Sequence, residues 1–425
     1  MTALVGMVDR YLGTVGPFDV PDPWWSHIEA VTAHLDRVLG VPCAVVRLLA
    51  VGDPDLGRGG TVEYHVEVAD LPEPGALSRD GVLGAASWPA MLAGHPRRAW
   101  WARPSGPREL VRWAVDAVGR PLTGTPVQVK TWNLSCLYRL PMAGGTVWAK
   151  ATAHFAGDEA AAIRLVRRHD ESLAPEVLAA DPARRRFVMR HVPGTDCWDA
   201  GVETVCDVVR RLVAVQAAIA GSGPSAAGSG AVRDARRAAA GSDAAIVERR
   251  PVALLDELPR LLDGELGGRL DPGELVAAGE LVGRLPGLIA ELESAGLPHS
   301  LVHGDLHPGN IVSDGSRHAL VDWAEAHLGH PAFDINCLLR WLPAEQRDVV
   351  ESAWADAWRA RVPGSDPRRA LPPVRVLGLV ANAVLYQRFL DNIEPTERVY
   401  HESDPASELR LALRCTAGDG TSLRV

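Results

Sequence analysis

Residues 301–310 read Leu-Val-His-Gly-Asp-Leu-His-Pro-Gly-Asn, and the interpretation of the whole chain starts from them. Asp305 and Asn310 lie five residues apart, and a second carboxylate, Asp322, follows seventeen residues after Asp305. Phosphoryl transfer uses such a set, because one aspartate receives or orients the attacking hydroxyl while an asparagine and a second aspartate hold Mg²⁺ against the phosphates. The spacing therefore predicts a Mg²⁺-dependent kinase site, with Asp305 as the catalytic base and Asn310 and Asp322 as metal ligands.

Two other interpretations of this region compete with a kinase site. Zinc would be held by several histidines, and four lie close together in the sequence: His303, His307, His327 and His330. The interleaved carboxylate and amide oxygens instead favour the harder Mg²⁺ ion. Alternatively, Asp305 and Asn310 could cap the backbone of their own loop. The presence of Asp322 favours catalysis, because a self-capping loop needs no second acid.

A lysine upstream supplies the positive charge that phosphates need. Lys150 ends the strand-like segment 147–150, which has the pattern of the kinase strand that presents a lysine to the α- and β-phosphates. Only Lys130 and Lys150 are lysines among 44 basic residues, so Lys150 is a candidate for a position where arginine does not substitute. Glu159 opens the next expected helix and is expected to pair with Lys150, with Asp158 as a rival. The alternative for Glu159 is a solvated acid at a helix start.

The hydrophobic pattern around these residues predicts two lobes. Strands are expected at residues 126–132, 136–141, 146–152 and 186–189, with a helix at 158–169. From about residue 202 the pattern is mostly helical, and the sequence Asp-Pro-Gly-Glu opens a helix at 271–285. Residues 221–245 are of low complexity and are expected to form a mobile excursion. We therefore expect a kinase N-lobe and hinge at 121–192 and a helical C-lobe with the catalytic and substrate sites at 193–425.

The first 120 residues predict a separate α/β segment of unknown role. Helical spacing at 24–39 and 108–118 and strand patterns at 43–51 and 60–69 support this prediction. No catalytic motif lies in the segment, so its expected role is packing or a lid on the substrate side. The expected fold class is thus α+β, with two lobes and an added N-terminal α/β segment.

Three motifs together resemble the aminoglycoside phosphotransferases and their choline-kinase-like relatives. They are His-Gly-Asp-Leu-His-Pro-Gly-Asn at 303–310, Val-Asp-Trp at 321–323 and Gly-His-Pro-Ala-Phe-Asp at 329–334. The resemblance extends over roughly residues 125–400 and implies the bilobal protein-kinase-like fold. It implies that Asp305 is the catalytic base, that Asn310 and Asp322 are the metal ligands, and that Lys150, held by Glu159, binds the phosphates.

The resemblance implies further nucleotide-binding positions. Residues 187–192 resemble the strand and hinge where the base docks, with Arg190 and Val192 supplying a carbonyl and an amide. No glycine-rich loop precedes Lys150, and the loop 133–136 stands in its place, so Ser135 and nearby amides are expected at the phosphates. Asp334 resembles the acid that braces the catalytic loop.

The segment between the metal aspartate and Asp334 favours a small acceptor. Asp334 follows only twelve positions after Asp322, which leaves no room for the activation segment that holds a peptide in protein kinases. His307 also lies where protein kinases usually carry lysine. The acidic run at 391–409 could receive a cationic aminoglycoside, or it could be a solvated surface. The thirteen tryptophans could include a stacking wall for a sugar or a base, or they could be core.

The expected function is transfer of the γ-phosphate of ATP or GTP to a hydroxyl of a small molecule. An antibiotic of aminoglycoside or nucleoside type is the leading acceptor, with resistance as the role. A metabolic sugar or amino-alcohol kinase is the alternative. A non-catalytic nucleotide-binding scaffold is the alternative of another class, and the presence of the lysine, the base and both metal ligands argues against it.

Composition excludes several other classes. The formal net charge of −9 argues against a nucleic-acid partner, because proteins that grip a polyanion are more often basic. No apolar run approaches the roughly 18 residues of a membrane span, and the first residues lack a secretory pattern. Six scattered cysteines without a Cys-x-x-Cys pair indicate a reducing compartment, so a cytoplasmic location is expected. The oligomeric state is not indicated.

Overall fold

The computed structural model describes residues 1–52, 58–78, 88–221 and 246–417 and forms two compact units. The first unit comprises Met1–Ala156, Val177–His191 and Leu390–Glu402, and the second comprises Gly157–Glu176, Val192–Phe389 and Ser403–Val425. The expected N-terminal segment and β-rich lobe thus belong to one unit, and the domain boundaries at residues 120 and 192 stay predictions. Nearly all of the low-complexity stretch, residues 222–245, lies outside the described residues.

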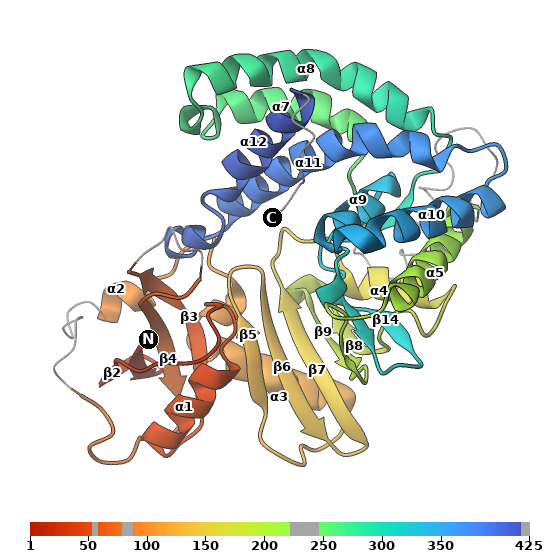
Figure 1. Cartoon of the computed structure of the whole chain (residues 1–425). Coiled ribbons are helices and arrows are strands. Elements are labelled where there is room, and N and C mark those ends of the chain that lie inside the picture. Colours follow the sequence, from red (N-terminus) through yellow and green to blue (C-terminus); the bar gives the residue numbers. More distant parts are fainter. Residues whose placement is uncertain (53–57, 79–87, 222–245, 418–425) are drawn as a thin grey trace. The chain divides into compact units, whose positions relative to one another are not determined.

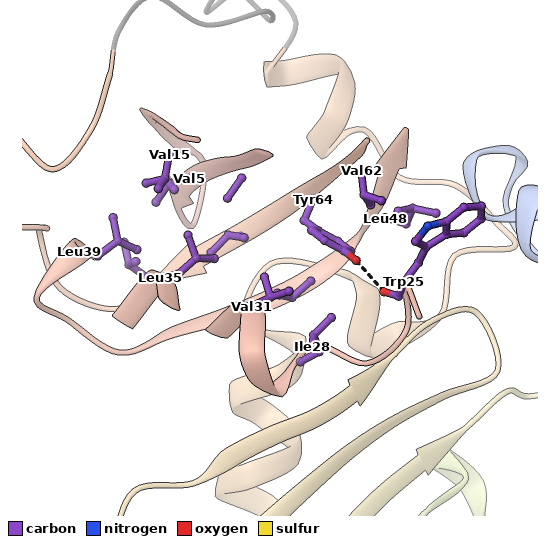
Figure 2. Close-up of a cluster of buried hydrophobic side chains, with 14 residues drawn as sticks. Val5, Val15, Trp25, Ile28, Val31, Leu35, Leu39, Leu48, Val62 and Tyr64 are labelled. Carbon is purple, nitrogen blue, oxygen red and sulfur yellow. Dashed lines mark hydrogen bonds between the residues drawn. The ribbon is translucent and has the colours of Figure 1, made fainter. Parts of the chain in front are cut away.

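The first sheet of the first unit is built from the N-terminal segment. Its strands, in the order β2-β1-β4-β3, are β1 (Thr2–Met7), β2 (Arg10–Val15), β3 (Cys43–Val51) and β4 (Val62–Val68). Neighbouring strands are antiparallel except for β1 and β4, which are parallel. Helix α1 (Glu29–Leu39) packs against this sheet (Figure 1). Its apolar stripe, Val31, Leu35 and Leu39, is fully buried (Figure 2).

The sequence prediction was wrong at two places in this segment. The helix expected at 24–39 begins only at Glu29, because the side chain of Asp22 accepts a hydrogen bond from the Trp24 amide at 3.0 Å and holds a turn there. Strands β1 and β2 are not expected from the sequence, because residues 1–15 show no pattern that is recognised as a strand. The strands expected at 43–51 and 60–69 are confirmed.

The second sheet of the first unit carries Lys150. Its order is β5-β6-β7-β9-β8, and all neighbours are antiparallel: β5 (Val127–Thr131), β6 (Ser135–Met142), β7 (Gly145–Thr152), β8 (Val177–Asp181) and β9 (Arg186–Arg190). Helix α3 (Gly106–Val118) packs on it, burying Leu110 and Ala114 against the strands. Two short pieces, α2 (Trp88–Leu92) and η2 (Trp100–Ala102), precede α3, and η3 (Pro182–Arg184) joins β8 to β9.

One glutamine joins the two sheets of the first unit. The side chain of Gln128 accepts a hydrogen bond from the amide of Val45 at 2.9 Å and donates one to the carbonyl of the same residue at 2.8 Å. Gln128 therefore pairs with strand β3 as a backbone amide would, and both of its polar atoms are satisfied although the residue is buried. The N-terminal segment is thus part of the body that carries the second sheet.

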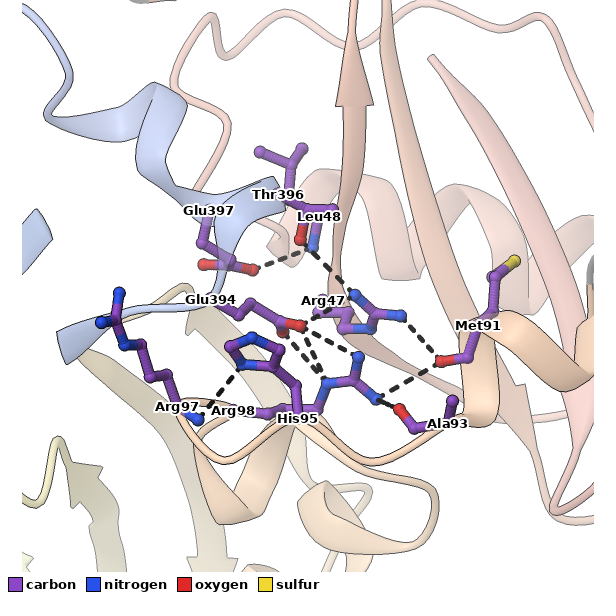
Figure 3. A network of polar contacts seen from close by, with 10 residues as sticks. All are labelled: Arg47, Leu48, Met91, Ala93, His95, Arg97, Arg98, Glu394, Thr396 and Glu397. Atoms are coloured by element: carbon purple, nitrogen blue, oxygen red, sulfur yellow. Dashed lines mark hydrogen bonds and ion pairs between the residues drawn. The ribbon is translucent and has the colours of Figure 1, made fainter. Parts of the chain in front are cut away.

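A C-terminal segment also belongs to the first unit. Residues Leu390–Glu402 contain η8 (Pro395–Tyr400), and the carboxylate of Glu394 lies between two buried arginines (Figure 3). Arg47 lies 3.3 Å and Arg98 3.0 Å from Glu394 Oε2. Glu397 accepts a hydrogen bond from the amide of Leu48 at 3.3 Å, while its Oε2 atom has no hydrogen-bond partner in the described part of the chain.

The second unit is mostly helical. Its helices are α4 (Glu159–Arg167), α5 (Val202–Gly221), α7 (Leu254–Asp263), α8 (Pro272–Glu293), α9 (Ala332–Trp341), α10 (Ala344–Arg361), α11 (Leu371–Asn392, whose last residues enter the first unit) and α12 (Asp404–Thr416). Short 3₁₀ turns are η4 (Pro251–Ala253), η5 (Gly267–Arg269), η6 (Pro308–Asn310) and η7 (Pro367–Ala370). Helix α8 packs against α7 and α12 (Figure 1).

Two small sheets complete the second unit. One has the order β10-β13-β14, from β10 (Thr195–Asp196), β13 (Ile311–Ser313) and β14 (His318–Leu320). The other has the order β11-β15-β12, from β11 (Val247–Glu248), β15 (His327–Gly329) and β12 (Ser300–Val302). The expected capping box is confirmed, since Asp271 and Glu274 cap the start of α8 reciprocally. The α+β class is thereby confirmed, and none of the helices described is long and apolar enough to cross a membrane.

Replacing Glu394 by alanine should destabilise the first unit strongly. Arg47 and Arg98 would keep their charges in a buried site without the carboxylate, which costs roughly 3–5 kcal/mol when one partner of a buried pair is removed. Urea unfolding followed by tryptophan fluorescence measures the change. Asp70→Ala, at an exposed acid of the same segment, is the control and should leave the transition in place. A transition of Glu394→Ala that coincides with that of the wild type would contradict the structural role.

Glu397 should make stability depend on pH. Burial and the neighbouring Glu394 raise the pKa of Glu397 to about 8, far above the value near 4.3 of an unfolded chain. Between these values only the folded state holds the proton, so wild-type stability should fall as pH rises, by at most about 1.4 kcal/mol per pH unit. Glu397→Gln cannot lose a proton and should lack this component. Unfolding of both proteins at a series of pH values tests this, and a constant difference between them would refute it.

Candidate active site

A short hairpin brings the two expected metal ligands together. Strands β13 and β14 are antiparallel, and Ile311 pairs with Leu320. Asn310 and Val321 therefore flank the same end of the hairpin, and the Val321 amide donates to the Asn310 carbonyl at 3.0 Å. Asp322 follows directly. The eleven residues between Asn310 and Asp322 thus fold back, so that an amide and a carboxylate twelve positions apart in sequence come from adjoining backbone.

The side chain of Asn310 is fixed by the loop that carries Asp305. Its Nδ2 atom donates to the Asp305 carbonyl at 2.8 Å and to the Asp305 carboxylate at 3.2 Å. Both amide hydrogens are thereby used, and Oδ1 is the atom left for a ligand. The geometry therefore orients Asn310 as an oxygen donor beside the carboxylate of Asp305.

The carboxylate of Asp305 is half exposed and lies next to His307. The Nε2 atom of His307 is 3.5 Å from Asp305 Oδ2, and the Asp305 side chain is 49 % exposed. Burial raises the pKa of Asp305, but the hydrogen bond and charge of His307 outweigh it and keep this pKa below its ordinary value. Asp305 is therefore ionised at neutral pH. Ionisation is the state in which a carboxylate can accept a proton from a hydroxyl.

Two exposed tryptophans flank His307. The ring of Trp198 stacks on it with centroids 5.4 Å apart, and that of Trp341 lies 5.9 Å away at a steeper angle. The two indoles are 45 % and 40 % exposed. Sequence reasoning considered a tryptophan wall without being able to say which tryptophans form it, because Trp198 and Trp341 are separated by more than a hundred residues.

His303 joins the loop that carries Asp305 to the segment that leads to Asp322, and both of its ring nitrogens are used in these contacts. Its ring is fully buried, with Nε2 at 3.0 Å from the Val321 carbonyl and Nδ1 at 3.3 Å from the Asp305 amide. One ring nitrogen must donate and the other accept, so the imidazole is neutral and in a single tautomer. Burial lowers the pKa of His303 to about 4, which agrees with this state. No group of three or more potential metal ligands from His, Cys, Asp and Glu occurs among the described residues, so the zinc interpretation finds no support there.

Asp334 braces the backbone that precedes Asp305. Its carboxylate accepts hydrogen bonds from the amides of His303 at 3.0 Å and Gly304 at 3.1 Å, and from the Gln216 side chain at 2.8 Å. Burial raises the pKa of Asp334 to about 7, against these three donors, which lower it. Asp334 thus makes the backbone contacts that the resemblance implies for it. Gln216 donates a further hydrogen bond to Asp334, which the sequence did not reveal. The available signal was a polar residue on the apolar face of α5.

Two residues of these loops have a positive φ, Gly304 and Asp322. Gly304 has a φ of +87°, and a Cβ atom at this position would lie 2.3 Å from the Glu325 carbonyl, so a side chain does not fit. Asp322 has a φ of +61°, in the left-handed region that residues other than glycine rarely adopt. Such conformations persist where the surroundings impose them, and they cluster at functional sites.

Glu159 holds the backbone immediately after Asp322. Helix α4 begins at Glu159, as expected, and Asp158 is its N-cap, accepting from the Ala161 amide at 3.0 Å. The buried carboxylate of Glu159 accepts a hydrogen bond from the amide of Trp323 at 3.1 Å. Within the second unit, Glu159 therefore restrains the backbone on the C-terminal side of Asp322. Its pairing with Lys150 stays a prediction.

The other expected nucleotide-binding residues lie on or beside the five-stranded sheet. Lys150 is buried in the central strand β7, where it pairs with Leu137 on one side and Phe187 on the other. Ser135 begins β6, and its hydroxyl accepts a hydrogen bond from the Trp132 indole at 2.9 Å. Arg190 is the last residue of β9, and Val192 follows that strand. The contacts expected of Ser135, Arg190 and Val192 with a nucleotide stay predictions.

The oxygen donors of the second unit fit Mg²⁺. Asn310 offers an amide oxygen and Asp322 a carboxylate, both of which are hard ligands. A Mg²⁺ ion completes its shell with water and substrate phosphates, so two protein ligands suffice. The fit follows from this donor chemistry and from the orientation of the Asn310 amide.

The acidic run at 391–409 is not a free anionic surface. Glu394 and Glu397 are only 4 % and 3 % exposed and belong to the polar network of the first unit. Glu408 is bound by Arg340 in the second unit. Acids that are neighbours in the sequence therefore lie in different environments. Glu394 and Glu408 form ion pairs with arginines, and Glu397 is protonated below a pKa of about 8.

A cavity of about 120 Å³ lies beside the catalytic loop in the second unit. Gly304, the residue before Asp305, lines it, together with Phe333, Cys337 and Arg340 at helical spacing on α9. Helix α11 supplies a second wall that includes Asn382 and Arg388. Burial, together with the charge of Asp305, raises the pKa of the Cys337 thiol.

Comparison with known proteins gives one family match. Residues 127–372 match the profile of the phosphotransferase enzyme family (APH). Choline kinase LicA from Streptococcus pneumoniae is 13 % identical, with 73 % of this chain and 99 % of that chain covered and a TM-score of 0.50. A choline/ethanolamine kinase family protein from Mesorhizobium loti is 18 % identical, with 69 % and 92 % covered and a TM-score of 0.46.

An aminoglycoside phosphotransferase in ternary complex with ADP and hygromycin B is also similar. It is 17 % identical, with 72 % of this chain and 98 % of that chain covered and a TM-score of 0.47. No curated protein matches the sequence. At these identities the likeness concerns the fold alone.

Replacing Asp334 by asparagine should loosen the catalytic loop. An amide cannot accept from all three N–H donors, so at least one buried donor loses its partner, at a cost of about 1–3 kcal/mol. Hydrogen exchange of the His303 and Gly304 amides should accelerate, and the urea midpoint should fall. Asp356→Asn, at an exposed acid of α10, is the control. Unchanged exchange at both amides would show that Asp334 does not brace the loop.

Proposed function

The chain belongs to the phosphotransferase enzyme family, and from this premise we propose that it transfers the γ-phosphate of a nucleoside triphosphate to a hydroxyl group of a small molecule. The observation that carries the proposal is the arrangement in the second unit of Asp305, Asn310 and Asp322. Asn310 is hydrogen-bonded to Asp305 and shares a hairpin end with the segment that leads to Asp322. Small-molecule kinases need this set of base and metal ligands, and the chain is a kinase of that kind.

In the proposed reaction the hydroxyl oxygen of the acceptor attacks the γ-phosphorus, and the bond from that phosphorus to the β–γ bridging oxygen breaks. The nucleoside diphosphate leaves with the electron pair, and the hydroxyl proton passes to the Asp305 carboxylate. Asp305 is prepared for this role because its pKa is lowered and its carboxylate is half exposed. Asn310 fixes the direction of that carboxylate, and the loop before it is tied down by Asp334.

The phosphates require positive charge as well as position. Mg²⁺, held by Asn310 and Asp322, would neutralise charge on the phosphate oxygens. Lys150 is proposed to bind the α- and β-phosphates, with Glu159 directing it. Ser135 is proposed to lie near the phosphates, and Arg190 and Val192 to bind the base of ATP or GTP through their backbone. The bracing of Trp323 by Glu159 supports a role for that carboxylate in holding the metal loop.

The identity of the acceptor divides the proposal into two candidate roles. An antibiotic acceptor would make the protein a resistance enzyme, and a sugar or amino alcohol would make it a metabolic kinase. The family includes proteins of both kinds among the structural neighbours, so membership alone does not choose. A non-catalytic nucleotide-binding scaffold is the alternative of another class. The preserved and braced Asp305 argues against it, because a scaffold that only binds nucleotide has no use for a base.

Asp305→Asn should abolish transfer and spare nucleotide binding. The amide cannot take the proton, so kcat should fall by on the order of 10²–10⁴-fold, which is the usual contribution of a general base. Turnover is measured as nucleoside diphosphate release with ATP or GTP, Mg²⁺ and a panel of hydroxyl acceptors. Nucleotide affinity is measured by calorimetry.

The matched control is Asp314→Asn. Asp314 is an exposed acid in the turn of the same hairpin, where it accepts hydrogen bonds from its own loop. This variant should retain activity. Undiminished turnover of Asp305→Asn would remove Asp305 from the mechanism, and transfer of phosphate to protein instead of to any small acceptor would overturn the proposed function.

A further inference from the structure

The cavity beside the Asp305 loop has a largely apolar wall. Apolar side chains line it from η4, α7, α9 and α11, namely Pro251, Leu254, Phe333, Ala381, Val384 and Leu385. Gly304, the residue before Asp305, lines it as well. Its volume of about 120 Å³ is close to the roughly 150 Å³ of an engineered protein cavity that holds benzene, so the space suits one six-membered ring.

The charged groups of this wall leave little charge for a ligand. Its four arginines all have partners, and three of the pairs are Arg249–Glu325, Arg250–Glu248 and Arg340–Glu408. The fourth, Arg388, also has an interaction partner. The carboxylate of the wall is that of Glu257, in the first turn of α7, where the positive end of the helix dipole offsets part of its charge. The wall therefore holds little available charge of either sign.

One buried amide in the wall has no hydrogen-bond partner. Asn336 on α9 is only 8 % exposed, yet its side chain makes no hydrogen bond to any residue that the structure describes. A Cβ atom at Gly378 would lie 2.5 Å from Asn336 Nδ2, so the amide is directed toward α11 and fits there because residue 378 is glycine. Buried amides are as a rule hydrogen-bonded, because leaving one unpaired costs free energy. Asn336 therefore has donors and an acceptor for a molecule in the cavity.

A neutral histidine supplies a second polar group. Nδ1 of His327 lies 2.9 Å from the Glu325 carbonyl, which can only accept, so Nδ1 carries the proton and Nε2 is an acceptor. The ring is as buried as Asn336, and burial lowers the pKa of His327 to about 3. His327 lines the same cavity. A ligand group that binds Nε2 must therefore donate a hydrogen bond to an uncharged ring.

A hydroxyl group matches these two residues better than a charged group does. A hydroxyl donates and accepts, so it can bind Asn336 through either amide atom and can donate to His327. An ammonium group only donates and would leave Nδ2 of Asn336 unpaired, and a carboxylate only accepts and cannot bind Nε2 of His327. Either charge would also lose its water shell inside an apolar wall that has no free counter-ion.

We propose that this cavity binds the acceptor, and that Asn336 and His327 hold an uncharged, hydroxyl-bearing part of it, such as a neutral sugar ring. The proposal rests on the proposed function, because Gly304 in the wall is joined directly to Asp305, which must receive the hydroxyl proton. It separates the candidate acceptors, since it favours a neutral sugar or polyol over an amino sugar or an amino alcohol.

The first experiment compares acceptors that share a size and differ in charge. Glucose, glucosamine and glucuronate form one series, and glycerol, aminopropanediol and glycerate form a second. The full chain is incubated with ATP or GTP and Mg²⁺ at low and at high ionic strength. Mass spectrometry identifies the products, and release of nucleoside diphosphate gives the rates.

Neutral members should gain phosphate with the highest kcat/KM in each series at both ionic strengths, because no charge takes part in the recognition. A higher kcat/KM for the cationic or the anionic members, or an active enzyme that phosphorylates no neutral member, overturns the proposal. Absence of any nucleotide turnover that depends on Asp305 would instead overturn the proposed function, so the two failures are distinguishable.

Asn336 provides the variant that tests recognition. Asn336→Leu keeps the size of the side chain and removes its hydrogen bonds, so KM for a neutral acceptor should rise about tenfold while nucleotide affinity stays the same. Asn336→Asp introduces a carboxylate and should shift the preference from glucose toward glucosamine, which a purely structural role would not do. Gln346→Leu removes a half-buried amide of α10 outside the cavity wall and is the matched control. An unchanged KM in Asn336→Leu would remove Asn336 from acceptor binding.

Gly378→Ala tests the same amide without deleting it. The added methyl group meets Nδ2 of Asn336, so it should displace the amide and raise KM for the neutral acceptor as Asn336→Leu does. The double variant should lose no more than either single variant, because both changes act on one contact. Gly283→Ala, at a position on α8 with open space around it, is the control and should leave KM unchanged. Additive losses in the double variant would contradict a shared contact and overturn the role of the Asn336 amide.

Discussion

A single buried carboxylate holds the backbone on which the chemistry depends. Asp334 accepts hydrogen bonds from the two consecutive amides that precede Asp305, and Gln216 completes its set of donors. The two amides belong to the residues that directly follow the short strand β12. Their hydrogen bonds to Asp334 therefore fix the direction of the backbone after the strand, and with it the position of Asp305. The backbone can take this direction because residue 304 is glycine. Its φ is positive, and its close approach to Glu325 leaves no space for a side chain. The backbone that leads into Asp305 is thus positioned by Asp334, while the Asp305 carboxylate itself is contacted by Asn310 and His307.

The segment 321–323, which contains Asp322, is held near the Asp305 loop by a different set of contacts. The neutral ring of His303 spans the Asp305 amide and the Val321 carbonyl, and Glu159 holds the Trp323 amide on the other side of Asp322. Both neighbours of Asp322 are therefore restrained, which explains how an aspartate stays in a left-handed conformation. A buried histidine that fits this function needs no charge, and burial keeps it neutral.

What the sequence could predict follows from how local each feature is. The strands around Lys150, the start of α4 at Glu159 and the capping box of α8 depend on neighbouring residues, and the structure confirms them. The strands β1 and β2 could not be recognised from short apolar runs, because they are stabilised by pairing with the distant strand β4. The contact of Glu394 with Arg47 and Arg98 joins the two ends of the chain, and no local pattern reveals it.

The difference between local and distant contacts also explains why the sequence indicates the type of reaction but not the acceptor. The groups assigned to proton transfer and metal binding lie within 303–334, in a sequence whose spacing is dictated by one hairpin and one loop. The cavity wall is assembled mainly from residues between 249 and 257, from α9 and from α11, so its lining residues are spread over more than a hundred positions of the sequence. The acidic run at 391–409 does not form one anionic wall, because Glu394 and Glu408 are each held in an ion pair with an arginine. Spacing can therefore identify the reaction type, while the acceptor is defined only by which distant side chains meet.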